Sequence, residues 1–224
     1  MSEAKHAAWA DFVFRRYLRG LFRKSFHALR LIGDVPEPPP HLPVVLIGNH
    51  NTWWDGFFPY FLNETYLHRK FFLMMLEEQL ARYPFFRKLG AFGIRQGHPR
   101  SVMETVTYSA SLLRNPQNLL CLYPQGALVP FQARPLGFQR GLQRIISLSG
   151  VPVTLLQYAV RCEFRGERLP EAFFVFAPPR TVVPGTSVNT VRAECDEQEL
   201  LDRLETEIAR GAQGRILLGR RGSK

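Results

Sequence analysis

The sequence predicts an α/β fold: a mixed, largely parallel sheet flanked by helices, with an N-terminal basic amphipathic helix. Three observations support this prediction. Short apolar segments alternate with helical patterns along the 224-residue chain, as in parallel strands joined by helical crossovers. Gly48-Asn49 and Pro124 end two of these segments, as turns do at strand ends. With 46% hydrophobic residues, the chain can bury one substantial core.

Residues 7 to about 32 have the periodicity of an amphipathic helix, and residues 1–35 are assigned to this segment. Arginine recurs every three or four residues on one side, and Gly33 and Pro36 give a stop signal. The other side is apolar and comprises Phe14, Leu18, Leu21, Phe22, Leu29 and Ile32. Basic residues opposite aromatic ones are typical of a helix in a membrane interface, which we favour. The alternative is that the apolar stripe docks on the rest of the domain.

The remaining chain divides into three parts. Residues 36–43 are a proline-rich connector, residues 44–194 are the main domain, and residues 195–224 are a C-terminal helix and a basic tail. Strands are expected at residues 44–47, 71–75, 92–94, 119–123, 151–160 and 173–176, and helices at residues 57–63, 77–82, 85–89, 99–114, 138–148 and 196–210. The last helix is acidic, and its carboxylates are expected to face solvent.

The stretch Val44–Tyr60 is the centre of the functional prediction. A buried strand of four apolar residues is followed by a Gly-Asn turn, then by His50 and, five positions later, by Asp55. Ligands in open α/β sheets bind beyond the carboxyl ends of strands, and an imidazole beside a carboxylate there can act as a general base. The spacing alone is weak evidence, because His6 and Asp11 repeat it in the N-terminal segment. From the residues alone, a structural role for the histidine stays open.

The stretch Asn49-His50-Asn51-Thr52-Trp53-Trp54-Asp55 is the first of four ordered blocks. The others are Leu89–Gly97, Tyr123-Pro124-Gln125-Gly126 and a segment beginning Val151-Pro152-Val153, which Phe138-Gln139-Arg140-Gly141 precedes. In this order the blocks resemble the signatures of the glycerolipid acyltransferase family, of the lysophosphatidic-acid acyltransferase type. The resemblance covers residues 40 to 180, and four ordered blocks are far more specific than any single one.

The resemblance implies an O-acyltransferase of lipid metabolism, similar to the 1-acylglycerol-3-phosphate O-acyltransferases of phospholipid biosynthesis. Such an enzyme moves a fatty acyl group from acyl-CoA or acyl carrier protein to a glycerolipid hydroxyl. An alcohol is a poor nucleophile at neutral pH, so His50 would take its proton while Asp55 orients the imidazole. Backbone N–H groups after Pro124 or near Gly126 are candidate donors to the oxyanion. Apart from the thioester co-substrate, no cofactor and no metal is expected.

The acceptor-binding positions depart from the family pattern. Where the resemblance implies a phosphate-binding arginine, the second block has Gln96, with Arg95 one residue early and so on the opposite face of an extended segment. In the third block, glutamine, alanine and leucine replace the usual glutamate, threonine and arginine. The residues assigned to acceptor or phosphate binding are Arg95, Gln96, Arg100, Gln125 and Gly126. Either shifted arginines, Arg134 and Arg140 included, bind a phosphate, or the acceptor is a neutral lipid or glycolipid.

The charge of the chain favours an anionic partner. The net charge is +10 and the pI is near 10.0, which is compatible with a membrane surface, an acidic substrate or nucleic acid. No nucleic-acid-binding signature is present, so we expect an anionic membrane surface, a fatty acyl thioester and a lipid acceptor. A catalytically silent lipid-binding relative is the alternative. Of Trp53 and Trp54, one is expected to pack and the other could form an apolar lip at the membrane.

The cysteines and the hydropathy favour a cytoplasmic protein that lies peripherally on the inner face of a membrane. Cys121, Cys162 and Cys195 are widely spaced and odd in number, so they predict neither a disulfide framework nor a zinc site. No run of eighteen uncharged apolar residues is present, so no transmembrane helix is expected. The N-terminus also lacks the pattern of a signal peptide.

Overall fold

The computed structural model describes residues 1–184 and 189–220 and confirms the predicted α/β fold. In this part of the chain, nine strands form one mixed sheet in the order β4-β3-β5-β2-β6-β7-β1-β9, and β8 pairs with β6. The strands are β1 (Ala28–Ile32), β2 (Val44–Gly48), β3 (Lys70–Leu76), β4 (Ala91–Ile94), β5 (Asn118–Leu122), β6 (Val153–Glu163), β7 (Glu171–Phe176), β8 (Arg180–Val182) and β9 (Arg215–Gly219). Neighbours from β4 to β6 are parallel, which is the predicted dominant arrangement.

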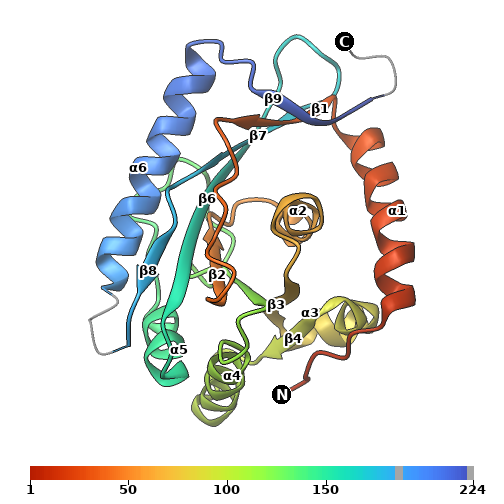
Figure 1. Ribbon diagram of the computed structural model, residues 1–224. Helices are drawn as coiled ribbons and strands as arrows, with labels where there is room; N and C mark the ends of the chain where they lie inside the picture. The colour runs from red at the N-terminus through yellow and green to blue at the C-terminus, as the bar shows by residue number, and fades with distance from the viewer. Residues whose placement is uncertain (185–188, 221–224) are drawn as a thin grey trace.

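Helices cover both faces of the sheet, with α6 and α1 on opposite sides of it (Figure 1). The helices are α1 (Ala8–Ser25), α2 (Phe58–Leu62), α3 (Glu77–Arg82), α4 (Pro99–Leu112), α5 (Gly141–Ser149) and α6 (Thr190–Ala209), with shorter helical turns at η1 (Trp53–Gly56), η2 (Asn63–Leu67) and η3 (Pro84–Leu89). Buried phenylalanines of α1 and α2 form one core cluster, while α4, α5 and α6 pack on the other face. Among the described helices, none has both the length and the apolar content needed to span a bilayer.

Strand β2 lies at the centre of the sheet, between β5 and β6, and is parallel to both. All five of its residues are buried. Val44 and Leu46 face the core cluster of α1 and α2, while Val45 and Ile47 face the cluster of α4 and α5. Both faces are covered, which explains why the strand is a continuous apolar run rather than an alternating one. The end of β2 therefore lies in the middle of the carboxyl edge of the parallel strands.

The N-terminal helix is shorter than predicted. It ends at Ser25, and Phe26 already has an extended backbone. The last residues of the predicted helix form strand β1, which pairs with β7 and β9. Leu29 and Leu31 point into the core, whereas Arg30 pairs with Glu171 at 2.5 Å between Nε and Oε1. The alternation of apolar and basic residues at Leu29, Arg30 and Leu31 is therefore that of a strand, although it also fits one face of a helix.

Two further strands were not predicted. β8 is only three residues long, and β9 lies in the segment that we expected to be a basic tail. β9 forms the edge of the sheet beside β1, and the part of the tail beyond residue 220 lies outside the described residues. Helix α6 begins at Thr190, not at residue 196, because the side chain of Asn189 accepts a hydrogen bond from the Val191 N–H at 3.0 Å and caps it.

Candidate active site

The turn after β2 is shaped by a close contact with β6. Gly48 lies against Tyr158 so tightly that a Cβ at this position would lie 2.6 Å from the tyrosine ring and 2.8 Å from its carbonyl oxygen. Only glycine fits this approach without a shift of the neighbouring strand. The next residue, Asn49, bonds the backbone of Val160 twice, through Oδ1 at 2.8 Å and Nδ2 at 2.9 Å. The end of β2 is therefore fixed just before His50.

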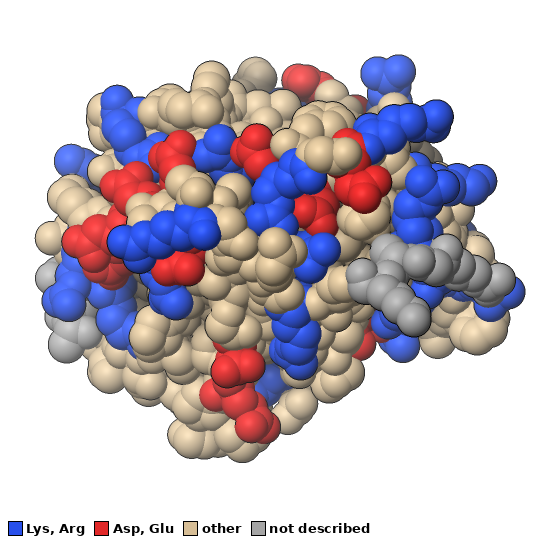
Figure 2. Space-filling model, turned by 90° about the horizontal axis from the view of Figure 1, so that it is seen from above, with Lys and Arg blue, Asp and Glu red and all other residues tan. Residues whose placement is uncertain are grey.

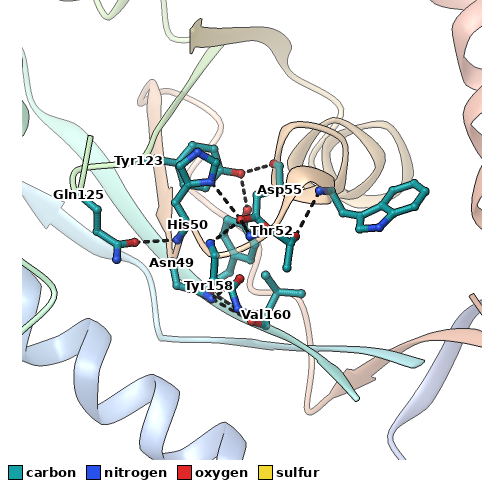
Figure 3. Close-up of polar contacts among 10 residues, drawn as sticks. Asn49, His50, Thr52, Asp55, Tyr123, Gln125, Tyr158 and Val160 are labelled. Carbon is teal, nitrogen blue, oxygen red and sulfur yellow. Dashed lines mark hydrogen bonds and ion pairs between the residues drawn. The ribbon is translucent and has the colours of Figure 1, made fainter. Parts of the chain in front are cut away.

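The carboxylate of Asp55 is fully buried and accepts hydrogen bonds from four donors (Figure 3). Its Oδ2 accepts from the backbone N–H groups of Asn51 at 2.7 Å and Thr52 at 2.8 Å, and lies 3.0 Å from Nδ1 of His50. Its Oδ1 accepts from the Thr52 hydroxyl at 2.7 Å, and that hydroxyl accepts from the Trp54 N–H at 3.2 Å. This capping box folds the turn back on itself. His50 and Asp55, which lie five positions apart in the sequence, are therefore in direct contact.

His50 presents its second ring nitrogen to the outside. Nδ1 faces Asp55, and within the described residues no hydrogen bond involves Nε2. With the proton on Nδ1, Nε2 is an available base. The ring stacks on Tyr123, with 4.4 Å between centroids and 19° between planes, and the side chain is 26% exposed. The imidazole is thus oriented on two sides and open on a third.

Two tyrosines, Tyr158 fully buried and Tyr123 partly buried, lie next to the pair. The Tyr123 hydroxyl donates to the backbone carbonyl of Asp55 and lies 2.9 Å from the Tyr158 hydroxyl. Burial raises the pKa of both phenols well above the ordinary value, so they stay neutral. Burial likewise raises the pKa of the Cys121 thiol and brings that of Cys162 to about 12, so neither is a thiolate nucleophile at neutral pH.

The second and third blocks close around the same turn. Gln125 accepts a hydrogen bond from the His50 backbone N–H at 2.7 Å (Figure 3). Gln96 donates to the carbonyl of Gly126 at 2.8 Å, and Gln139 donates to the carbonyl of Gln125 at 3.3 Å. Blocks that lie far apart in the sequence therefore meet at one place, the carboxyl edge of the sheet.

The predicted site residues divide into two groups. The first group is joined by the contacts above and comprises His50, Asp55, Gln96, Gln125 and Gly126. Arg95 and Arg100 form no described hydrogen bond or ion pair with that group. Instead, Arg100 is almost fully exposed and pairs with Glu104 at 3.4 Å. The charge of Arg95 acts on Glu77 instead. Burial raises the pKa of the Glu77 carboxyl, but hydrogen bonds from Ser2 and, to a smaller extent, the charge of Arg95 lower it, and the net shift is downward.

The sequence did not indicate all the residues of the site. Tyr158 lies in an apolar strand with no signal of its own, and nothing in the first block predicts a role for Thr52. The tryptophan pair is divided as predicted. Trp54 packs on Phe26 with 4.9 Å between centroids, whereas Trp53 is 65% exposed.

Of the backbone N–H groups predicted as oxyanion donors after Pro124 or near Gly126, that of Gly126 itself is occupied. The Gly126 N–H donates to the Tyr123 carbonyl at 3.0 Å and is not available to a substrate. The reason is the tight turn after β5, in which Gly126 has a φ of +70°. Any amide that stabilises an oxyanion here must come from a neighbouring residue.

Comparisons with known proteins concern the fold and the family. Among solved structures, the chain is similar to the crystal structure of the 1-acyl-sn-glycerophosphate (LPA) acyltransferase PlsC from Thermotoga maritima. The TM-score is 0.57 and the identity 15%, over 88% of this chain and 79% of that one, so the likeness concerns the fold. A comparison with curated proteins gives no match. A family model described as Acyltransferase matches residues 34–156. This match spans more than half of the chain and contains the His50–Asp55 turn, so the protein belongs to the acyltransferase family.

Proposed function

We propose that the protein transfers a fatty acyl group from acyl-CoA or acyl carrier protein to a hydroxyl of a glycerolipid, with His50 as the general base. The observation that carries this proposal is the His50–Asp55 pair. Nδ1 lies 3.0 Å from a fully buried carboxylate, while Nε2 points out of the turn without a described partner. A histidine that only packed in the core would need neither the four donors to Asp55 nor an open nitrogen.

The reaction needs one nucleophile and one proton carrier. Nε2 of His50 takes the proton of the acceptor hydroxyl as its oxygen attacks the thioester carbonyl. The tetrahedral intermediate then collapses, the C–S bond breaks, and the imidazolium returns the proton to the leaving thiolate. Asp55 stabilises the imidazolium in between. Because the acceptor itself attacks, no serine or cysteine nucleophile is required, which agrees with the high pKa of the buried Cys121 thiol.

The oxyanion of this intermediate needs donors close to His50. Val129 lies beside the base, since its N–H donates to the His50 carbonyl at 2.8 Å. Ala127 and Leu128 precede it in the same loop, and their N–H groups donate to no acceptor in the described part of the chain. We assign the oxyanion contact to these amides.

The surface of α1 supports contact with a membrane. Its inner side is buried through Ala10, Phe14, Leu18 and Phe22, yet its outer side also carries exposed apolar residues, namely Trp9, Phe12, Val13 and Tyr17. A helix that only docked on the domain would not need this second apolar face. Basic residues flank it, as in helices that lie in an anionic interface. Trp53, beside the base, is exposed as well. We propose peripheral binding to the inner, cytoplasmic face of a membrane.

The charge is not uniform over the molecule. Figure 2 shows the face with the β1–β9 edge, where acidic and basic side chains are interspersed. Among the described residues, ion pairs join Arg161 of β6 to Glu205 of α6 at 2.7 Å and Arg165 to Glu171 of β7 at 3.1 Å. Such paired charges attract an anionic surface less than unpaired ones do. The outer face of α1 is therefore the better candidate for the membrane contact.

An uncharged acceptor is favoured over a phosphate-bearing one. Gln96, not Arg95, faces the third block, where it donates to Gly126 at 2.8 Å. Leu128, which is 59% exposed, replaces the second arginine expected from the family pattern. A bidentate cation is thus missing from both positions, and an amide recognises hydroxyl groups as well as it recognises phosphate. A neutral lipid or glycolipid acceptor fits these side chains best.

The test is acyl transfer from labelled palmitoyl-CoA to lysophosphatidic acid, monoacylglycerol and a lipid glycoside. We expect product with wild-type protein, preferentially with an uncharged acceptor, and a loss of about 10³-fold or more in His50→Ala. His41→Ala is the matched control, because His41 is exposed and lies outside the four blocks. If palmitoyl-CoA gives no product, acyl carrier protein replaces it as the donor. Vesicle binding without product from either donor would support the catalytically silent lipid-binding alternative instead.

A further inference from the structure

Two phenol hydroxyls form a hydrogen-bonded chain that ends on the backbone of Asp55. Tyr123 directly follows β5, and its hydroxyl donates to the Asp55 carbonyl oxygen (Figure 3). The same hydroxyl lies 2.9 Å from that of Tyr158 in β6. A phenol has one proton, and Tyr123 uses it on Asp55, so Tyr158 is the donor in the second bond. The chain therefore runs in one direction, from β6 through the end of β5 to the turn after β2.

The bond from Tyr123 differs in origin from the bonds to the Asp55 carboxylate. The groups that face the carboxylate belong to His50, Asn51 and Thr52, which are part of the same turn. Tyr123 belongs to the end of a neighbouring strand instead. Its hydroxyl therefore fixes the backbone of Asp55 relative to the sheet, whereas the carboxylate bonds fix the shape of the turn itself.

The ring of the same tyrosine contacts the other member of the pair. It stacks on the imidazole of His50, with 4.4 Å between centroids and 19° between planes. An aromatic face within about 6 Å of a cation attracts it. The ring therefore also favours the imidazolium that forms when Nε2 takes up a proton. One side chain acts on Asp55 through its hydroxyl and on His50 through its ring.

Tyr158 is a rigid support for this arrangement. It is fully buried, and Gly48 packs against it so closely that a Cβ on the glycine would lie 2.6 Å from the tyrosine ring. The ring of Tyr158 thus has little room to move, and its hydroxyl is held toward that of Tyr123. Hydrogen bonds in such a chain polarise one another, so the bond from Tyr158 strengthens the bond from Tyr123 to Asp55.

We propose that Tyr123 is a positioning residue for the His50–Asp55 pair, with its hydroxyl fixing the backbone of Asp55 and its ring fixing the plane of the imidazole. Tyr158 acts one step behind, by orienting the Tyr123 hydroxyl. Neither phenol gives up its proton in the reaction, and Nε2 of His50 remains the base. A shift of Asp55 would turn the imidazole and move Nε2 away from the acceptor hydroxyl. Such a misplacement lowers kcat more than it changes KM.

Because this role rests on the proposed acyl transfer, the experiment combines kinetics with a measurement that needs no activity. kcat and KM are measured, with the thioester and acceptor that wild type uses, for Tyr123→Phe, Tyr123→Leu, Tyr158→Phe, the double Phe variant and the control Tyr60→Phe. Tyr60 is also buried, and its hydroxyl donates to Asp11 at 3.0 Å. The control therefore removes the same kind of bond from a site outside the turn. In parallel, the Nδ1–H resonance of His50 is recorded by ¹H,¹⁵N NMR without substrate.

The variants should fall in a fixed order of kcat. Tyr123→Phe keeps the ring and should lose about tenfold in kcat, with KM within about twofold of wild type. Tyr123→Leu loses the ring as well and should lose roughly 50-fold, so that phenylalanine restores part of the activity. Tyr158→Phe should lose only about threefold, and the double Phe variant should match Tyr123→Phe, because both hydroxyls act through one bond to Asp55. Tyr60→Phe should stay within about twofold of wild type.

The NMR measurement separates a positioning role from a general loss of stability. The Nδ1–H resonance should be the same in wild type and Tyr60→Phe, and should shift or broaden in Tyr123→Phe. An unchanged resonance in Tyr123→Phe would overturn the proposal, and so would a Tyr60→Phe variant that loses as much kcat as Tyr123→Phe. If wild type transfers no acyl group at all, the proposed function fails, while the resonance still decides whether Tyr123 positions the pair.

Discussion

Two segments of this chain carry the same spacing of histidine and aspartate, and they use it in opposite ways. At the end of β2, His50 and Asp55 are in direct contact at 3.0 Å. At the N-terminus, His6 and Asp11 bind different partners. Nε2 of His6 lies 2.8 Å from the Phe71 carbonyl, whereas Asp11 accepts a hydrogen bond from the Tyr60 hydroxyl at 3.0 Å. The first pair forms a site, and the second fastens the N-terminal segment to the domain.

The backbone between the two residues accounts for the difference. After β2 the chain turns back, and the N–H groups of Asn51 and Thr52 converge on Asp55. Between His6 and Asp11 the chain enters α1, so successive residues advance along a helix axis and the two side chains separate. The spacing of two residue types is therefore no evidence for a site unless the intervening residues specify a turn.

The largest effect is expected from removing the charge of each aspartate in turn. Asp55→Asn should lower kcat by about 10³- to 10⁴-fold, because an amide does not stabilise the imidazolium and can orient the wrong tautomer. Asp11→Asn should leave kcat unchanged, since an amide oxygen still accepts from Tyr60. Acyl-transfer assays on both variants measure this contrast. Equal losses in the two variants would contradict the assignment of the site to the turn after β2.

A smaller effect is expected from the residue that closes the turn. Thr52→Val removes one donor to Asp55 and the acceptor for the Trp54 N–H. We expect kcat to fall about tenfold and the free energy of unfolding to fall by about 1 kcal/mol. The matched control is Thr65→Val, which removes a hydrogen bond to the Phe61 carbonyl outside the four blocks. If both variants lose stability but neither loses activity, the capping box does not contribute to the orientation of the base.

The sequence predicted the fold class and the turn that brings His50 to Asp55 because both depend on local signals. The four apolar residues of β2, the Gly-Asn turn and the His-Asp block all lie within twelve positions of one another. The contribution of Tyr158 and the burial of Glu197, which we expected to face solvent, could not be predicted in this way, because they depend on the long-range packing of β6 and α6. The error at β1 has a related cause, since its pairing with β7 and β9 is not visible in its own five residues.

Stability as a function of pH tests the ionisation of Glu197, a fully buried carboxyl of α6. Burial raises the pKa of the Glu197 carboxyl from its ordinary value of 4.5 to about 8. Its neutral form is favoured in the fold, so its contribution is fully present below pH 4.5 and is lost as the pH rises through 8. Glu197→Gln should therefore gain stability relative to wild type as the pH rises over this window, by on the order of 5 kcal/mol. Urea unfolding at several pH values measures the difference, and a constant difference would contradict the buried, neutral carboxyl.

The smallest effect concerns His6, and its dependence on pH is opposite to that of Glu197. Burial lowers the pKa of His6 below 6.5. The neutral imidazole is favoured in the fold, so its contribution is present above pH 6.5 and is lost as the pH falls through the lowered value. His6→Gln keeps a donor for the Phe71 carbonyl but cannot take up a proton. It should therefore reduce the acid-side loss of stability by at most about 1 kcal/mol, because the site is only half-buried and partly screened by solvent.

The same variant should leave kcat unchanged, because the His6 ring packs edge-on against Phe72, with 4.7 Å between centroids, and does not contact the turn after β2. Thermal unfolding between pH 5 and pH 8, together with one acyl-transfer assay at pH 7, measures both expectations. A fall in kcat comparable to that of His50→Ala would mean that the N-terminal segment positions the site, and that the two histidine–aspartate sequences are not functionally separate. An unchanged kcat with a flatter pH dependence of stability would instead show that the two histidines have different roles. The fold requires His6 to be neutral, whereas the reaction requires His50 to accept a proton.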